Sequence, residues 1–508
     1  MNFFKRYISL TFYILIICIT MPASDTVLRV GLHTFPNSLN PIYSTTEDSQ
    51  PVINKIFDSL YYYDREGKIT SDLIAGATSS LEKGRSVTRL TLKKGIRFSD
   101  GKELDANDII QTIRTLKNPV YNYPYLSTTD CIDSVERIDS YNLIIRWSSP
   151  IVSWQNHLTF KILNSRQISN VSPATLRKLN LSGTGPYVLK SVMAPVRIIL
   201  EINKFYSVHE QKLNSSMNHP MYRYIHYDVF TDAYLAPLKL INHEIDICEL
   251  QPESVVSYSR LPEWQKKFRV ISYKKSGYTY LVFNLKNPAI TPNLRNHIYN
   301  TLIAGNFVER FLEQKGEPVK TPFLYHNSHE ASKRLNTFPL KPVTLKILTN
   351  SESKVRKEFI LFLSEELKPL HITLEPFFLE YNAFLDYLKK GKFDLAVSGY
   401  MMDTDYNMNE IFHWDSYFNY SSFRDDQMEL LLQKGLMEFD PVKRESIYTE
   451  AYEKWKKSLP FIPLFSLYYY VGVSRDVPVP TEFYSVVSSE GDFLFNISHW
   501  KPKISKSL

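Results

Sequence analysis

The sequence predicts an α/β fold with several domains. Three observations support this prediction: a length of 508 residues, a stretch in which strand-like and helix-like spacings alternate, and a segment that places a strand, a tight turn and a capped helix in succession. A chain of this length corresponds to two to four domains. The composition, 44% hydrophobic and 22% charged, is that of a globular protein with enough apolar residues for a large core.

The first residues have the pattern of a signal peptide. A positive start with Lys5 and Arg6 precedes the mostly apolar residues 8–19, and small residues around Ala23 form a cleavage site. The apolar run is shorter than the ~20 residues that a membrane span needs, and no later segment reaches that length. We therefore expect residues 1–23 to be a cleaved signal peptide.

The three cysteines leave two questions open. Cys18 is where a lipoprotein would be acylated, but the bulky residues 15–17 before it disfavour that processing, so a chain without a lipid anchor is preferred. Cys131 and Cys248 would remain after cleavage, and an oxidising compartment would allow them to pair. Because they fall in different predicted domains, two free thiols are the preferred interpretation.

Charge and aromatic content narrow the class of partner. The formal net charge of +7 falls by two once Lys5 and Arg6 are removed, and no basic block concentrates what is left. This pattern argues against nucleic-acid binding. The 34 Tyr and 30 Phe residues exceed what core packing alone suggests, and they suit a roomy pocket that accepts varied side chains.

The first half of the chain opens with a strand over residues 28–32 and a turn-rich segment over residues 36–41. Helical spacing over residues 52–60 begins a second region. The most specific segment follows at residues 90–110, written LTLKKGIRFSDGKELDANDII. Its alternating apolar positions predict a strand up to Phe98, then a tight turn.

A helix should follow that turn. Asp105 occupies the N-cap position, Asp108 lies three residues on, and Ile109, Ile113 and Leu116 recur at helical spacing.

Two glycines mark the next crossing of the chain. Residues 183–187 read GTGPY and lead into a strand at residues 187–189. A phosphate-binding loop is the rival interpretation, but the required third glycine and Lys-Ser pair are missing. Farther on, residues 278–284 predict a buried strand and residues 294–308 a helix.

The clearest alternation runs from residue 344 to residue 400. Strands are predicted over 345–348, 372–379 and 393–400, with helices over 355–367 and 381–390. The nearly continuous apolar character of the last strand indicates a buried parallel sheet, where ligands lie beyond the carboxyl ends of strands. Met401, Met402 and Asp403 occupy that end. A further helix after Asp440-Pro441 and a strand over residues 465–472 complete the pattern.

Four strings in this order resemble the family-5 extracytoplasmic solute-binding proteins, the peptide-binding subunits of ABC importers. They are SLNP (38–41), the 90–110 segment, GTGPY (183–187) and FDLAVSGYMMD (393–403), which is similar to the family pattern FDLALxGWxAD. The resemblance implies a two-lobed periplasmic binding protein fold of class II type, with an extra subdomain and two crossings between lobes. The domains would be residues 24–52, 180–275 and 470–508 (domain I), 53–179 (domain II) and 276–469 (domain III).

The resemblance also implies the ligand site. Asp403 aligns with the carboxylate that binds the α-ammonium of a peptide, with Asp405 as its competitor and a plain turn carboxylate as the alternative. Backbone groups near β-strand residues 399–401 and an extended segment at 44–46 would pair with the ligand, and Tyr400 would flank the ligand or pack in the core. The expected site residues are Asp403, Gly399, Tyr400, Met401, Ser44, Thr45 and Thr46.

Enzyme motifs fail where they are tested. His329-Glu330 lacks the second histidine of a zincin, and no nucleophile elbow, P-loop or dinucleotide fingerprint is present. We therefore expect a monomeric periplasmic protein without a cofactor, which binds short peptides and serves an ABC permease in the inner membrane. Alternatives are a binder of nickel, haem or a cell-wall peptide, for which His326, His329 and His413 are scattered candidates, an exported hydrolase, and a surface adhesin or chaperone.

Overall fold

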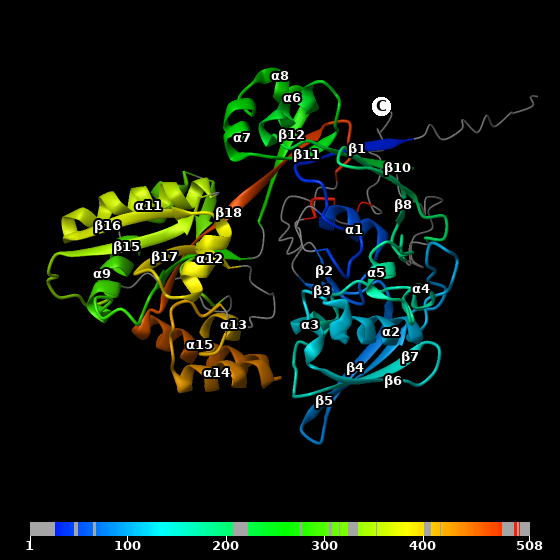
Figure 1. Ribbon diagram of the computed structural model, residues 1–508, viewed down its shortest axis with the longest axis horizontal. Helices are drawn as coiled ribbons and strands as arrows, with labels where there is room; N and C mark the ends of the chain where they lie inside the picture. Colours follow the sequence, from blue (N-terminus) through cyan, green and yellow to red (C-terminus); the bar gives the residue numbers. More distant parts are fainter. Residues whose placement is uncertain are drawn as a thin grey trace, which may run out of the picture.

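Two lobes joined by one long strand make up the computed structural model (Figure 1). It describes residues 26–44, 49–64, 68–206, 222–274, 277–303, 307–313, 315–323, 334–351, 353–400, 408–416, 418–479, 492–494 and 497. Strands and helices alternate in both lobes, which confirms the predicted α/β class and the two-lobed architecture. The predicted signal peptide and Cys18 lie outside the described residues.

The first lobe is built on a mixed sheet. Its strands are β1 (Val27–Leu32), β8 (Tyr187–Met193), β9 (Arg197–Ile202), β10 (Tyr224–Val229), β11 (Ile247–Leu250) and β12 (Phe268–Lys274). β1 lies between β10 and β11 and runs parallel to both, while β8, β9 and β10 pair antiparallel. The helices that accompany this sheet are α1 (Gln50–Ile56), α6 (Ala236–Ile241), α7 (Pro252–Tyr258) and α8 (Pro262–Lys267).

A smaller antiparallel sheet extends the first lobe. It has the order β4 (Ile74–Glu82), β5 (Arg85–Leu92), β7 (Asn142–Trp147), β6 (Ile132–Arg137), and the short pair β2 (Tyr62–Tyr63) and β3 (Ile69–Thr70) lies beside it in sequence. The helices here are α2 (Ala106–Lys117), α3 (Ser127–Asp130), α4 (Ser165–Ile168) and α5 (Pro173–Leu176). The chain thus separates a second packing unit from the large sheet.

Helix α2 begins as predicted. The Asp105 side chain accepts hydrogen bonds from the backbone N–H groups of Asn107 and Asp108, and the Asp108 carboxylate accepts from the N–H of Asp105. This reciprocal capping satisfies donors that the first turn leaves open. The predicted strand before it was too long, because β5 ends at Leu92. Phe98 is fully buried in a loop, so burial there imitates the spacing of a strand.

The GTGPY segment packs its glycines against helix α1. A Cβ on Gly183 would lie 1.9 Å from the backbone oxygen of Ile56, a separation that no side chain tolerates. Thr184 between the glycines donates a hydrogen bond from Oγ1 to Asp58 Oδ2 at 2.8 Å. This contact connects the start of β8 to the residues that follow α1. Burial raises the pKa of Asp58 to about 6, with the Thr184 hydrogen bond acting in the opposite direction.

We expect the Asp58→Asn variant to be more stable than the wild type at pH 7.5 by about 2–3 kcal/mol. A carboxyl whose folded-state pKa is raised destabilises the fold as pH rises from 3.8 to about 6. Asparagine still accepts the Thr184 hydrogen bond and carries no charge. Urea unfolding at pH 4 and pH 7.5 measures the difference, which should nearly vanish at pH 4. Lower stability of Asp58→Asn at pH 7.5 would contradict this account.

The second lobe carries the other half of the large sheet. Its strands are β13 (Tyr278–Phe283), β14 (Gly316–Pro318), β15 (Val343–Asn350), β16 (Ile372–Leu379) and β17 (Leu395–Tyr400). β15 runs parallel to β16 and β17, as predicted for the alternating region. β13 pairs antiparallel with β17. The expectation of a purely parallel sheet was therefore wrong, because a strand from outside the alternating region completes it.

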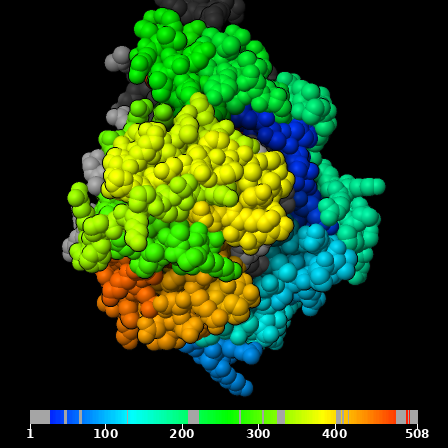
Figure 2. Space-filling view, turned by 60° about the vertical axis from the view of Figure 1, so that its left-hand side comes forward, coloured from blue at the N-terminus to red at the C-terminus, as the bar shows by residue number. Residues whose placement is uncertain are grey.

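The helices of the second lobe follow the predicted spacing closely. They are α9 (Pro292–Ile303), α10 (Phe307–Leu312), α11 (Lys354–Leu367), α12 (Tyr381–Lys389), α13 (Asn409–Phe412), α14 (Asp426–Met437) and α15 (Pro441–Ser458). The single helix predicted over residues 294–308 is replaced by α9 and α10, which are assigned separately. Figure 2 shows this lobe from its outer face, with the segment of α11 and α12 in yellow above that of α14 and α15 in orange.

Strand β18 (Phe461–Ser474) belongs to both lobes. Its first residues pair with β13 and β14, and its last residues lie between β11 and β12. Phe465 is buried in the core of the second lobe, whereas Val471 and Val473 are buried in the core of the first. The chain also crosses between β12 and β13, where Ser466 Oγ donates to the Gly277 carbonyl at 2.6 Å. The numerical domain boundaries stay a prediction.

Cys131 and Cys248 are both free thiols, as the sequence favoured. Within the described ranges, no helix is both long and apolar enough to cross a membrane.

Candidate functional site

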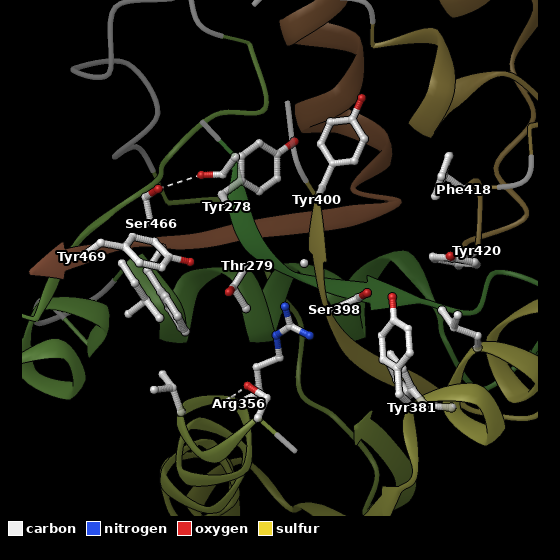
Figure 3. A pocket seen from close by; sticks show the side chains of 18 residues that line it. Tyr278, Thr279, Arg356, Tyr381, Ser398, Tyr400, Phe418, Tyr420, Ser466 and Tyr469 are labelled. Atoms are coloured by element: carbon white, nitrogen blue, oxygen red, sulfur yellow. Dashed lines mark hydrogen bonds between the residues drawn. The ribbon is translucent and has the colours of Figure 1, made fainter. Parts of the chain in front are cut away.

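A cavity of about 700 Å³ opens on the second lobe, above strands β13 and β17 and beside the first turn of α11 (Figure 3). Its lining comes from five strands and helices and from the crossing segment of β18. Most of the lining side chains are aromatic or apolar. The lining residues are Gly277, Tyr278, Thr279, Ser353, Val355, Arg356, Tyr381, Phe384, Leu385, Ser398, Gly399, Tyr400, Phe418, Tyr420, Phe465, Ser466, Leu467 and Tyr469.

Tyrosines from the two central strands form one wall of the cavity. Tyr278 of β13 and Tyr400 of β17 are paired across the ladder, with ring centroids 6.0 Å apart. Tyr278 is 6% exposed and its hydroxyl has no hydrogen-bond partner, and burial raises its pKa. An unpartnered buried hydroxyl carries a desolvation cost that a ligand acceptor would relieve.

The backbone of β17 is open on one side where it reaches the cavity. β15 pairs with β17 only at Leu395 and Ala396, so no strand continues beside Gly399 on that side. Thr349 Oγ1 donates to the Val397 carbonyl at 2.9 Å, which shows that the backbone groups of Val397 face the β15 side. Alternate residues of a strand direct their backbone groups to the same side. The amide and carbonyl of Gly399 therefore face the open side as well.

Arg356 lies over this open backbone. Ser353 caps α11 by accepting from the Arg356 N–H, and the side chain rises toward β13 and β17 to end between Thr279 and Ser398 (Figure 3). Its Nη1 donates to Asn350 Oδ1 at 3.0 Å. A Cβ on Gly399 would lie 2.2 Å from Nη2, so only glycine leaves room for the guanidinium. Burial lowers the pKa of Arg356, with smaller opposing effects from Tyr280, Tyr381 and Tyr469.

The predicted site residues are only partly placed. Gly399 and Tyr400 line the cavity. Ser44 is buried in the first lobe, where its N–H donates to the Asn40 carbonyl at 3.1 Å, and it does not line this cavity. Asp403, Met401, Thr45 and Thr46 lie outside the described residues, as does Asp405. Their roles stay predictions.

The sequence reasoning missed Arg356. The available signal was an arginine in the first turn of the helix that follows β15, together with a glycine in an otherwise apolar strand. Neither indicates the other, because 43 residues of sequence separate Arg356 from Gly399.

A metal site finds no support in the part of the chain that the structure describes. No three His, Cys, Asp or Glu side chains in that part lie close enough to hold an ion. His413 stacks on Trp414 with ring centroids 5.8 Å apart, and its Nδ1 accepts from the Asp415 N–H. His326 and His329, the other candidates, lie outside the described residues.

Comparison with known proteins adds independent information. A family model described as bacterial extracellular solute-binding proteins, family 5 (middle), matches residues 74–422. The oligopeptide-binding protein AppA of Bacillus subtilis (strain 168) is 22% identical over 520 residues, covering 94% of this chain and 92% of the relative. The periplasmic oligopeptide-binding protein OppA of Haemophilus influenzae is also 22% identical, over 85% of this chain and 86% of the relative.

Solved structures agree on the fold. AppA from Bacillus subtilis in complex with a nonapeptide superposes with a TM-score of 0.70, covering 94% of this chain and 98% of that one at 21% identity. A periplasmic EDTA-binding protein, EppA, superposes with a TM-score of 0.79 over 94% of this chain and 96% of that one, at 15% identity.

Proposed function

This chain belongs to family 5 of the bacterial extracellular solute-binding proteins, and from that premise we propose that it captures short peptides between its lobes. It then delivers them to an ABC-type permease in the membrane. The full-length relatives in both sequence comparisons bind oligopeptides, as their names state. We further propose a periplasmic location, export through the N-terminal signal peptide and a monomeric state.

The open backbone of β17 at Gly399 is the observation that supports a peptide best. Its amide and carbonyl face a cavity of about 700 Å³ with no strand beside them. Every peptide offers the same main-chain groups, so pairing with this edge would bind peptides of many sequences. The aromatic walls would accept different side chains without specific hydrogen bonds.

The position of the cavity beside β18 suggests how the ligand is enclosed. Phe465, Ser466 and Leu467 of β18 line the cavity, and this strand carries the connection to the first lobe. Lys354 of α11 pairs with Glu253 of α7 at 3.0 Å, which brings the two lobes into contact beside the cavity. Bending at the crossing segments would close the lobes over a bound peptide.

Asp403 remains our candidate for the α-ammonium of the peptide. It follows β17 by three residues, at the carboxyl end of the strand, where ligands of open α/β sheets are found. Ser44, Thr45 and Thr46 would approach the ligand from the first lobe.

A direct ligand analysis tests the proposal. We expect native mass spectrometry of protein purified without denaturation from its own periplasm to detect peptide masses of a few residues, which disappear after denaturation and refolding. Calorimetry of the refolded protein with an equimolar pool of alanine peptides of two to six residues should then show binding. A bound non-peptide solute, together with no heat from any peptide, would refute the proposal; cleavage of the added peptides would indicate an enzyme.

A further inference from the structure

The cavity contains a cation without an anion. Arg356 is largely enclosed, and among the described residues its guanidinium has one hydrogen-bond partner, the neutral Asn350, and no carboxylate. A guanidinium has five N–H donors, so most of its hydrogen-bonding capacity is unused. Burial lowers its pKa, which shows that the folded protein disfavours this charge. Buried charges are normally paired.

Neighbouring cations on the same surface are paired. Lys354, two residues earlier, forms an ion pair with Glu253 at 3.0 Å. Arg310 on α10 pairs with Glu366 at 3.2 Å. The groups that surround Arg356 are instead neutral tyrosines, Tyr280, Tyr381 and Tyr469. The absence of an acid around Arg356 is therefore a local property of the cavity.

Gly399 keeps the guanidinium exposed to the cavity. Any side chain at this position would collide with Nη2 at 2.2 Å and displace the charged group. The same glycine presents its amide and carbonyl on the open side of β17. A ligand that pairs with this backbone would thus bring its own groups against Arg356.

We infer that Arg356 binds a carboxylate of the ligand, and that the cavity selects peptides whose C-terminal or side-chain carboxylate lies beside Gly399. Arginine suits this role because its planar fork matches both carboxylate oxygens. This inference rests on the proposed function and adds the group that the cavity recognises. It also gives a reason why an uncompensated charge is kept in an otherwise apolar cavity.

The chain limits the length of such a ligand. Asp403 lies four residues after Gly399, so their Cα atoms are at most ~14 Å apart. A peptide that places its ammonium at Asp403 and its carboxylate at Arg356 therefore has at most about five residues. Tri-alanine is a suitable probe, since it carries a single carboxylate and no side-chain charge.

Arg356→Met is the decisive variant. We expect the wild type to bind tri-alanine at least ~10-fold more tightly than tri-alanine amide, and Arg356→Met to bind both with the weaker affinity. Ala-Ala-Glu amide separates the two sources of carboxylate. Binding of this amide to the wild type as tightly as tri-alanine, with loss in Arg356→Met, assigns the side-chain carboxylate; weak binding assigns the C-terminal one.

A second measurement separates ligand binding from a structural role. Arg356→Met should have a Tm equal to or above that of the wild type without ligand, because it removes an unpaired buried charge. Gly399→Ala should weaken tri-alanine binding while keeping the charge. Arg310→Met, in the same lobe but outside the cavity, should change affinity by less than ~2-fold.

Two results overturn the inference in different ways. If tri-alanine and its amide bind the wild type equally, Arg356 is not a carboxylate site although the protein binds peptides. If no alanine peptide binds the wild type, the proposed function fails together with it.

Discussion

Replacing Lys55 by methionine is expected to destabilise the first lobe by about 3–5 kcal/mol. Lys55 Nζ and Asp492 Oδ2 are 2.5 Å apart, and the two side chains are only 3% and 1% exposed. Removing the cation leaves a buried carboxylate without its charge partner, which is far more costly than losing a surface pair. Chemical unfolding followed by the fluorescence of Trp147 and Trp154, both buried in the first lobe, measures the change.

Two further variants control this experiment. Lys55→Met combined with Asp492→Leu should recover most of the loss, because both charges are then replaced by apolar groups. Arg89→Met breaks an exposed pair with Glu82 and should cost less than about 1 kcal/mol. A loss of similar size in Arg89→Met would show that burial does not determine the effect.

The Asp403→Asn change is expected to weaken peptide binding by ~10-fold or more, using 1.5–3 kcal/mol for a hydrogen bond to a charged group. Asparagine keeps the shape of the side chain and removes the charge that compensates the ammonium of the ligand. The stability of the unliganded protein should change little. Calorimetry of wild type and variant, each with free and N-acetylated tri-alanine, measures the coupling.

In that cycle, acetylation should weaken binding to the wild type and have much less effect on Asp403→Asn. Equal binding of free and acetylated peptide to the wild type would exclude Asp403 as the ammonium site. Asp405, or a ligand of another class, would then be the better interpretation.

Much of the fold could be predicted because its signals are local. The capping box at Asp105 and Asp108 and the N-cap of α15 at Asp440 depend on residues three positions apart or fewer. The alternation from β15 to β17 reflects burial of regular elements. In contrast, the end of β5 and the antiparallel position of β13 depend on contacts with distant segments, which periodicity does not encode.

The cavity shows the same limit. Gly399 and Tyr400 were expected from a motif contained in one strand. Arg356 was not, since its significance comes from a glycine on another strand, and from the absence of acids around it in three dimensions. Ser44, expected near the ligand, is buried in the first lobe away from the described cavity.

The shared strand β18 also determines when folding can finish. It is flanked by β13 and β14 in one lobe and by β11 and β12 in the other, yet it spans residues 461–474 of 508. Neither half of the large sheet can be completed until more than nine tenths of the chain has been synthesised. During synthesis, β11 and β13 would lack a neighbour, and such contacts between distant segments form slowly. For a chain that crosses a membrane before it folds, this order delays the native structure until translocation is nearly over.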